Sequence, residues 1–187
     1  MIVFFAEPVR HVILDRDGVL NTEAPGGGWI TRPEDWVWVP GALQGLRLLS
    51  DAGLRISVAT NQSGVGRGVM TRDDLQRVND HMLAEAARAG AQIDEVVFCP
   101  HAPADGCACR KPAPGLMLSL LRSSGIPAEQ TLLVGDALRD LQAANSAGIR
   151  AVLVRTGKGR STERDPARPT VQVFDDLRDA AAAIVDG

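Results

Sequence analysis

Residues 11–18, His-Val-Ile-Leu-Asp-Arg-Asp-Gly, join a short apolar run to a turn that carries two carboxylates. Comparable apolar runs rich in Val, Ile and Leu recur at residues 55–59, 95–99, 131–134 and 151–154. Runs of this length and composition are typical of strands buried on both faces of a parallel sheet. They predict an α/β fold built on a doubly wound, Rossmann-like parallel sheet.

Amphipathic segments between the apolar runs predict the helices that cover such a sheet. They span residues 42–51, 72–88, 115–123, 139–147 and 176–185. Thr71 is a suitable N-cap for the second of these helices, and Gly53, Gly90 and Gly148 mark helix ends. A polar connection over residues 155–169 leads to a last strand and the final helix.

One domain accounts for residues 1–187, because a chain of this length builds a single core. Residues 19–40 are too long for a tight connection and contain three glycines, so we interpret them as a flap beside the site, with a short strand at 36–39. No segment is long enough for a large cap domain, which predicts that specificity comes from loops.

The charge of the chain is modest, with a net value of −3 and a pI near 5.6. This balance argues against nucleic acid or an anionic membrane as a partner. The apolar residues 1–6 are too few for a signal-peptide core, and no apolar run reaches membrane length. We therefore expect a cytoplasmic protein with a small-molecule substrate, and a monomer, because no large exposed apolar helix face stands out. The role of residues 1–10 stays open.

Two carboxylates, Asp15 and Asp17, follow the first predicted strand on one sharp turn. One carboxylate at such a place can attack phosphorus while its neighbour transfers protons. A turn in which an aspartate merely caps the next element is the structural alternative, and an isolated Asp-x-Asp does not separate the two.

Further polar groups follow other strands, and the carboxyl ends of parallel strands meet at one edge of a sheet. Residues 60–63, Thr-Asn-Gln-Ser, offer a hydroxyl, amides and main-chain N–H groups to a phosphoryl oxygen. Lys111 is one of only two lysines and suits charge neutralisation. Asp136 and Asp140 add oxygen ligands of the kind that Mg²⁺ prefers. Each segment alone also fits an ordinary turn or loop.

A separate cluster contains all three cysteines of the chain together with a histidine: Cys99, His101, Cys107 and Cys109. Three thiolates and one imidazole suit tetrahedral Zn²⁺, and a full shell of protein ligands indicates a structural rather than a catalytic site. Buried apolar cysteines or a redox pair are the alternatives. Zinc in this loop, residues 99–109, would fix the segment that carries Arg110 and Lys111.

The segments Asp15-x-Asp17-Gly, Thr60, Lys111 and Asp136-x-x-x-Asp140 together resemble the signature of the haloacid dehalogenase-like phosphatases. The resemblance implies Asp15 as nucleophile and Asp17 as general acid and base. It implies catalytic phosphate binding by Thr60, with Asn61 beside it, and charge neutralisation by Lys111. It also implies a catalytic Mg²⁺ held by Asp15, Asp136 and the main-chain carbonyl of Asp17.

Residues 11–159 resemble one family of these enzymes more closely, the D-glycero-D-manno-heptose 1,7-bisphosphate phosphatases. The likeness rests on Thr-Asn-Gln-Ser-Gly-x-x-Arg-Gly at 60–68, Cys-Pro-His at 99–101 and Cys-x-Cys-Arg-Lys-Pro at 107–112. It implies removal of the C7 phosphate, which leaves heptose 1-phosphate on the way to the heptose of surface lipopolysaccharide. The implied substrate-binding residues are Asp15, Arg16, Asp17, Glu23, Thr60, Asn61, Gln62, Ser63, Arg67, Arg110 and Lys111.

This chain departs from the pattern in its short zinc loop and at Ala137, where many relatives have a polar or cationic residue. Histidinol-phosphate phosphatase is the alternative substrate class, because it shares the catalytic motifs and a zinc loop. A phospho-acceptor signalling domain also uses Asp, Thr, Lys and Mg²⁺, but Asp17 can activate water and so favours turnover. A non-catalytic zinc-stabilised interaction module is a further alternative, and the complete set of catalytic residue types argues against it.

Overall fold

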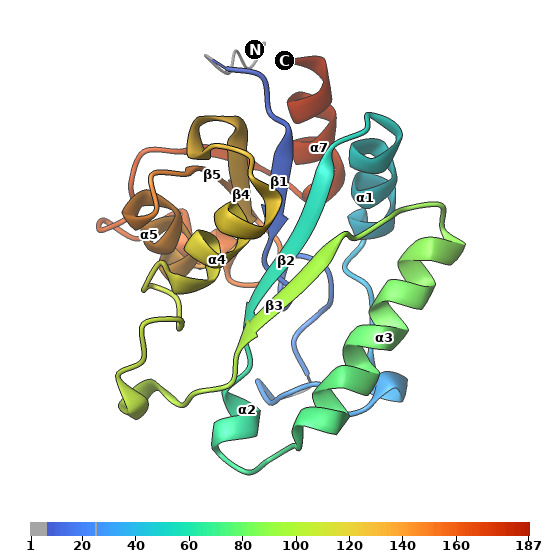
Figure 1. Ribbon diagram of the computed structural model, residues 1–187, viewed down its shortest axis with the longest axis vertical. Helices are drawn as coiled ribbons and strands as arrows, with labels where there is room; N and C mark the ends of the chain where they lie inside the picture. The colour runs from blue at the N-terminus through green and yellow to red at the C-terminus, as the bar shows by residue number, and fades with distance from the viewer. Residues whose placement is uncertain (1–6, 25) are drawn as a thin grey trace.

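The computed structural model describes residues 7–24 and 26–187 and contains a six-stranded parallel sheet in the order β3-β2-β1-β4-β5-β6 (Figure 1). The predicted doubly wound α/β fold is confirmed, with each of the five predicted sheet strands present to within two residues. The strands are β1 His11–Leu14, β2 Arg55–Asn61, β3 Glu95–Cys99, β4 Thr131–Gly135, β5 Arg150–Val154 and β6 Gln172–Phe174.

The helices also follow the predicted bounds to within one residue at each end, apart from two short helices that were not predicted, α2 and α6. They are α1 Ala42–Asp51, α2 Ser63–Gly66, α3 Arg72–Arg88, α4 Gly115–Ser124, α5 Leu138–Ser146, α6 Gly159–Thr162 and α7 Leu177–Asp186, with 3-10 turns at Pro33–Asp35, Pro103–Asp105 and Ala128–Gln130. Thr71 caps α3 as predicted, since its hydroxyl accepts a hydrogen bond of 3.0 Å from Asp74 N. No helix in the described part of the chain is long and apolar enough to cross a membrane.

Alternate residues of each strand pack into different cores, as the two-residue period of a strand requires. Val12 and Leu14 of β1 face a core formed with α1, α3 and α7, whereas Ile13 faces a second core formed with α4 and α5. Figure 1 shows these two groups of helices on opposite sides of the sheet. The central strands are therefore covered on both faces, and their carboxyl ends are left as the natural place for a site.

The register of the sheet brings the predicted site segments together. Leu14 pairs with Val58 of β2 and with Val134 of β4, so the residues that follow these three strands emerge at the same level. Strand order changes direction between β1 and β4, and ligands in doubly wound sheets bind at such switch points. Asp15 and Asp136 lie on the two sides of this point.

The predicted strand at residues 36–39 is wrong. This segment makes an isolated bridge between Trp38 and Asn21 and two main-chain hydrogen bonds with residues 20–22, but no strand. Pairing stops here because Pro40 has no N–H group and Gly41, with a φ of 85°, turns the chain into α1. Within residues 19–40, the apolar side chains Val19, Leu20, Ile30, Trp36 and Val39 are buried in the first core. The interpretation of residues 19–40 as a flap stays a prediction, and among the described residues of this segment Glu23 and Gly26 to Gly28 are exposed.

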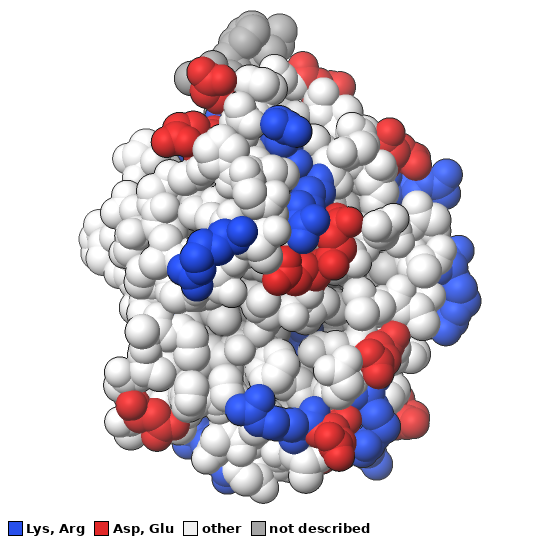
Figure 2. Space-filling model, in the orientation of Figure 1, with Lys and Arg blue, Asp and Glu red and all other residues white. Residues whose placement is uncertain are grey.

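Charged side chains of both signs are interspersed on the face of the molecule shown in Figure 2. Several charged side chains of the molecule form exposed ion pairs, such as Arg47 with Asp51 on α1, where the N–O distance is 2.9 Å. Such pairs contribute little to stability, because water and salt screen them. The surface on this side agrees with the modest net charge of the chain.

Candidate active site

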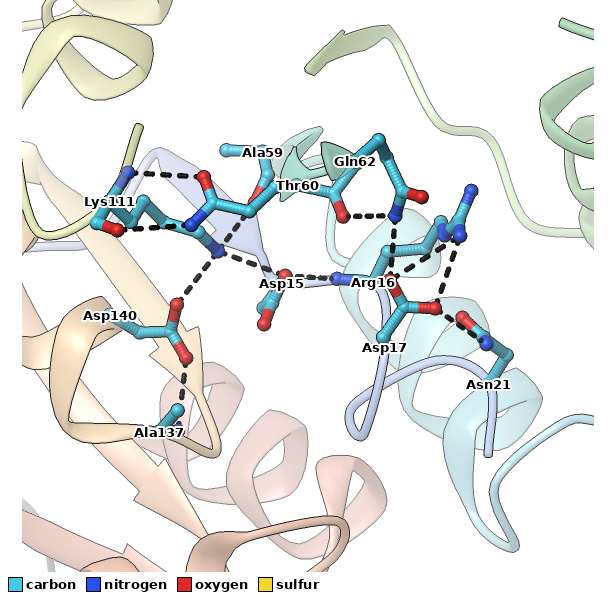
Figure 3. Close-up of polar contacts among 11 residues, drawn as sticks. Asp15, Arg16, Asp17, Asn21, Ala59, Thr60, Gln62, Lys111, Ala137 and Asp140 are labelled. Atoms are coloured by element: carbon cyan, nitrogen blue, oxygen red, sulfur yellow. Dashed lines mark hydrogen bonds and ion pairs between the residues drawn. The ribbon is translucent and has the colours of Figure 1, made fainter. Parts of the chain in front are cut away.

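Asp15 follows β1 and is almost fully buried, with one carboxylate oxygen occupied and the other available. Its Oδ1 accepts hydrogen bonds from Arg16 N at 2.7 Å and from the Lys111 ammonium at 2.9 Å (Figure 3). Among the described residues, no group donates to its Oδ2. Two donors on one oxygen fix the orientation of the carboxylate, so the second oxygen is presented for reaction.

Lys111 is fully buried and directs its ammonium at three oxygen atoms. These are Asp15 Oδ1 at 2.9 Å, Asp140 Oδ1 at 2.7 Å and the carbonyl of Ala59 at 2.8 Å (Figure 3). An ammonium has three N–H groups, so all of its donors have partners in the protein. Lys111 is therefore placed to neutralise charge around Asp15, and it would have to release a partner in order to contact a ligand directly.

Asp140 is the counter-ion of Lys111, a role that the sequence did not reveal. Its Oδ2 accepts a hydrogen bond of 3.0 Å from Ala137 N at the start of α5, and its Oδ1 contacts Lys111. Burial alone would raise the pKa of Asp140, but the charge of Lys111 outweighs burial and lowers it. The sequence signals available for this role were the position of Asp140 four residues after Asp136 and the scarcity of lysine in the chain.

We call Asp15, Asp136 and Asp140 the carboxylate cluster, because they offer oxygen atoms that all lie within 4.8 Å of one another. Burial and then mutual repulsion raise the pKa of Asp15 to about 6 and that of Asp136 to about 8. Asp136 Oδ1 is buried and has no hydrogen-bond partner in the described part of the chain. An unpartnered buried oxygen in a group of carboxylates fits a hard cation such as Mg²⁺.

The main chain packs tightly around Asp136. A Cβ added to Gly18 or to Gly157 would lie 2.1 Å from Asp136 Oδ2, and both glycines have positive φ angles. Only glycine fits at either position. The turn after β1 and the loop after β5 therefore close directly on this carboxylate.

Asp17 is held by three side chains. Arg16 contacts its carboxylate at 3.1 Å, Asn21 donates to Oδ1 at 2.9 Å and Gln62 donates to Oδ2 at 2.6 Å (Figure 3). Burial would raise the pKa of Asp17, but the charge of Arg16 and these hydrogen bonds lower it instead. Asp17 is therefore ionised in the ligand-free protein at neutral pH. No sequence signal had pointed to Asn21.

The Arg16 side chain is fully buried. It donates to Asn79 on α3 at 3.1 Å, contacts the Asp17 carboxylate at 3.1 Å and lies over the Trp36 ring, 5.8 Å from the ring centre. The main-chain N–H of Arg16 donates to Asp15 Oδ1. Arg16 therefore positions both carboxylates of the turn, and its contact with substrate stays a prediction.

The segment after β2 contributes in a different way from that predicted. Thr60 Oγ1 accepts a hydrogen bond of 2.9 Å from Gln62, which orients the threonine hydroxyl. Asn61 binds the main chain of Lys111 through its amide, accepting from N at 3.0 Å and donating to O at 3.0 Å. Ser63 is buried at the start of α2. The Asn61 side chain therefore positions Lys111, its amide nitrogen retains a second N–H, and its role in binding phosphate stays a prediction.

Glu23, Arg67 and Arg110 make their contacts with other residues than Asp15, and Glu23 pairs with Lys158 at 2.7 Å. Arg67 lies over the ring of Trp29 at 5.9 Å, and Arg110 donates to the carbonyl of His101 at 3.2 Å. Their roles in binding substrate stay predictions.

We call Cys99, His101, Cys107 and Cys109 the cysteine cluster, in which all three thiols are free. The sulfur atoms and His101 Nδ1 lie 3.1–3.6 Å from one another in the pairs that make contact. Bonds of about 2.3 Å to sulfur and 2.0 Å to nitrogen set tetrahedral zinc ligands roughly 3.5–3.8 Å apart. The four ligand atoms therefore face a common centre with spacings close to those of a zinc site.

Comparison with protein families and relatives gives a consistent result. A family model described as HAD-hydrolase-like matches residues 108–180. The chain is 39% identical to the D-glycero-beta-D-manno-heptose-1,7-bisphosphate 7-phosphatase of Pseudomonas putida, over 95% of this chain and the whole of that protein. The enzyme of the same name from Bordetella bronchiseptica is also 39% identical, over 95% of this chain and 98% of the relative.

Solved structures agree with these relatives. The fold superposes with a TM-score of 0.90 on the crystal structure of D,D-heptose 1,7-bisphosphate phosphatase from Bordetella bronchiseptica, which covers 95% of this chain and 98% of that one at 39% identity. That structure is a complex with magnesium and phosphate.

Proposed function

The chain belongs to the haloacid dehalogenase-like D-glycero-beta-D-manno-heptose-1,7-bisphosphate 7-phosphatases, and from this membership we propose that it removes the C7 phosphate of that substrate and leaves the anomeric phosphate in place. The β-anomer is proposed because the relatives are named for it. The observation that carries the proposal is the geometry of Asp15, whose Oδ1 is held by Lys111 while its Oδ2 is available for attack.

In the first step, Asp15 Oδ2 attacks the phosphorus of the C7 phosphate and the bond from phosphorus to the C7 oxygen breaks. Asp17 gives a proton to the departing oxygen. Asp17 is ionised in the free protein, so it must take up this proton as the phosphate dianion arrives, because a neighbouring negative charge raises the pKa of a carboxyl. Lys111 balances the charge that gathers on Asp15.

In the second step, Asp17 takes a proton from water, the water oxygen attacks phosphorus and the bond to Asp15 Oδ2 breaks. This restores Asp15 and releases inorganic phosphate. Gln62 and Asn21 hold the Asp17 carboxylate in place throughout. The N–H groups and hydroxyl of residues 60–63 are the proposed donors to the phosphoryl oxygens.

Asp15, Asp136 and the main-chain carbonyl of Asp17 would hold Mg²⁺, as the unpartnered Asp136 oxygen supports. When bound, this ion supplies positive charge against the phosphoryl oxygens. Lys111 forms the ion pairs of the carboxylate cluster, and the charge of Arg139 also acts to lower the pKa of each of its three carboxyl groups.

The cysteine cluster is the proposed site of a structural Zn²⁺. Its loop leads directly into Arg110 and Lys111, so zinc would fix the position of the catalytic lysine. We also propose one domain without a large cap, with the loops after β1 and β3 shaping specificity, and a monomer. Large exposed apolar side chains are few and lie on different elements, such as Leu48 on α1 and Leu118 on α4. The cytoplasmic location stays a prediction.

The test is Mg²⁺-dependent phosphate release, compared as kcat/KM, from each anomer of heptose 1,7-bisphosphate, from histidinol phosphate and from p-nitrophenyl phosphate. We expect the β-anomer to be preferred by about a hundredfold or more, which corresponds to roughly 2.7 kcal/mol. A preference for histidinol phosphate would overturn the substrate but keep the chemistry. No phosphate release from any of them would overturn the chemistry.

A further inference from the structure

Lys158, the only lysine besides Lys111, is the N-cap residue of the short helix α6 in the loop after β5. Its main-chain N–H donates to Asp136 Oδ2 at 2.8 Å. The loop is held there by the close approach of Gly157 to Gly18, where an added Cβ on Gly157 would lie 2.6 Å from Gly18 Cα. The main chain of Lys158 is thus fixed at the reacting end, while its side chain is free to extend outward.

The Lys158 ammonium contacts Glu23 Oε1 at 2.7 Å, and both side chains are substantially exposed, at 46% and 37%. Glu23 follows Asn21 and Thr22 in the loop after β1, and Asn21 holds Asp17. The ion pair therefore joins two loops that are both anchored to catalytic carboxylates. An ion pair this exposed contributes little to stability, because water and salt screen it, so a more highly charged ligand can replace either partner.

The topology places cations on both sides of the nucleophile. Arg110 comes from the β3 side of the sheet and Lys158 from the β5 side, with β1 and Asp15 between them. Ala137, next to Asp136, offers no charge on the β5 side. Lys111 already directs all three N–H groups at protein oxygens. A substrate with a second phosphate needs a cation with an exposed, exchangeable partner, and Lys158 is such a cation.

We propose that Lys158 determines specificity for a second phosphate: its ammonium leaves Glu23 and binds the phosphate that the substrate retains. This rests on the proposed function, since only a bisphosphate has a retained phosphate. The exchange is favourable because a phosphate dianion carries more charge than a carboxylate and offers more acceptor oxygens. Glu23, once released, accepts hydrogen bonds from sugar hydroxyls.

The experiment compares heptose 1,7-bisphosphate with heptose 7-phosphate, which has the same leaving oxygen but no second phosphate. Lys158→Met should lower kcat/KM for the bisphosphate about tenfold to a hundredfold, mainly through KM, and change the monophosphate by no more than about threefold. Lys158→Arg should restore most of the preference. Arg160→Met removes an exposed cation of the same helix and should change neither substrate.

An equal fall for both substrates would overturn the proposal, since Lys158 would then act only by holding the loop at Asp136. Unchanged kinetics would overturn it as well. If the wild-type enzyme releases no phosphate from the bisphosphate, the proposed function fails separately. Lys158 is then judged by inhibition of p-nitrophenyl phosphate hydrolysis: Lys158→Met must weaken inhibition by fructose 1,6-bisphosphate more than inhibition by fructose 6-phosphate, and equal weakening or none refutes its role.

Discussion

The carboxylate cluster and the cysteine cluster both gather metal-ligating atoms, but they draw on different parts of the fold. The first collects side chains from the ends of β1 and β4 and the start of α5, all fixed by the buried sheet. The second takes its four ligands from the end of β3 and one half-exposed loop. A site at strand ends is formed by the fold itself, whereas a site within one loop depends on what binds there.

The two clusters also differ in how their charge is balanced. Lys111 lies between Asp15 and Asp140, so much of the charge in the carboxylate cluster is balanced by the protein. In the cysteine cluster the contacts are among the thiols and His101 themselves. We therefore expect changes in the first cluster to affect chemistry and changes in the second to affect stability.

The largest expected effect comes from Asp15→Asn, because an amide cannot attack phosphorus. We expect kcat to fall by at least about 10⁴-fold, or roughly 5.5 kcal/mol of barrier. The melting temperature should be unchanged or higher, since burial and repulsion oppose the charge on Asp15. Zinc content should be unchanged. Asp73→Asn, on the exposed side of α3, is the control, and residual activity within tenfold of wild type would refute the nucleophile.

The second-largest effect is expected from the loss of a cysteine ligand. Cys109→Ser should reduce bound zinc, measured by elemental analysis, and lower the melting temperature by about 5–10 °C, as expected for roughly 2–4 kcal/mol in a chain of this size. We expect kcat/KM to fall about tenfold through displacement of Lys111. Ala108→Ser, between two ligands, should keep the metal. Full activity in a zinc-free variant would show that the two clusters are independent.

The third prediction concerns Asn61, the link between the two regions. Asn61→Ala removes two hydrogen bonds to the main chain of Lys111 and should lower kcat/KM about three- to tenfold, with most of the loss in kcat. Zinc content and Mg²⁺ affinity should be retained. An increase in KM alone would instead indicate that Asn61 contacts the substrate.

The smallest effect is a dependence of stability on pH in Mg²⁺-free protein. The pKa of Asp136 is about 8 and that of Asp15 about 6, both above the ordinary value of 3.8. The folded state then holds protons that the unfolded state has lost. The contribution of these two carboxyl groups to the free energy of unfolding is therefore present at low pH and disappears as the pH rises through 8. The melting temperature should fall by a few degrees between about pH 6.5 and 8.5, and added Mg²⁺ should restore it.

A separate histidine sets the lower limit of that pH range. Burial and then the nearby Arg55 lower the pKa of His11, which contacts Ser57 at 2.9 Å, to about 4. The unfolded state binds the proton more readily, so stability is lost as the pH falls from about 6.5 toward 4. Measurements above pH 6.5 therefore avoid the titration of His11. A flat profile there would mean that a protein group already neutralises Asp136.

The sequence predicted the sheet and the meeting of Asp15, Thr60, Lys111 and Asp136, because apolar runs and parallel topology fix where strand ends lie. It could not predict which polar partner each side chain takes. In the sequence, Arg16 is a cation next to the nucleophile. In the folded chain its side chain is buried because it donates to Asn79 and packs against Trp36, both distant in the sequence. Likewise, the side-chain amide of Asn61 hydrogen-bonds to the main chain of Lys111, which lies fifty residues later in the sequence.

The cysteine cluster lies at the end of β3, which is an edge strand of the sheet. An edge strand presents unpaired main-chain groups to other molecules, and proteins limit this by covering or shortening such edges. Here Cys99 ends β3, and the loop that follows returns beside the strand to bring Cys107 and Cys109 to it. If zinc holds this loop at the end of β3, as proposed, we expect that loss of zinc would release the loop and make the protein more prone to aggregate.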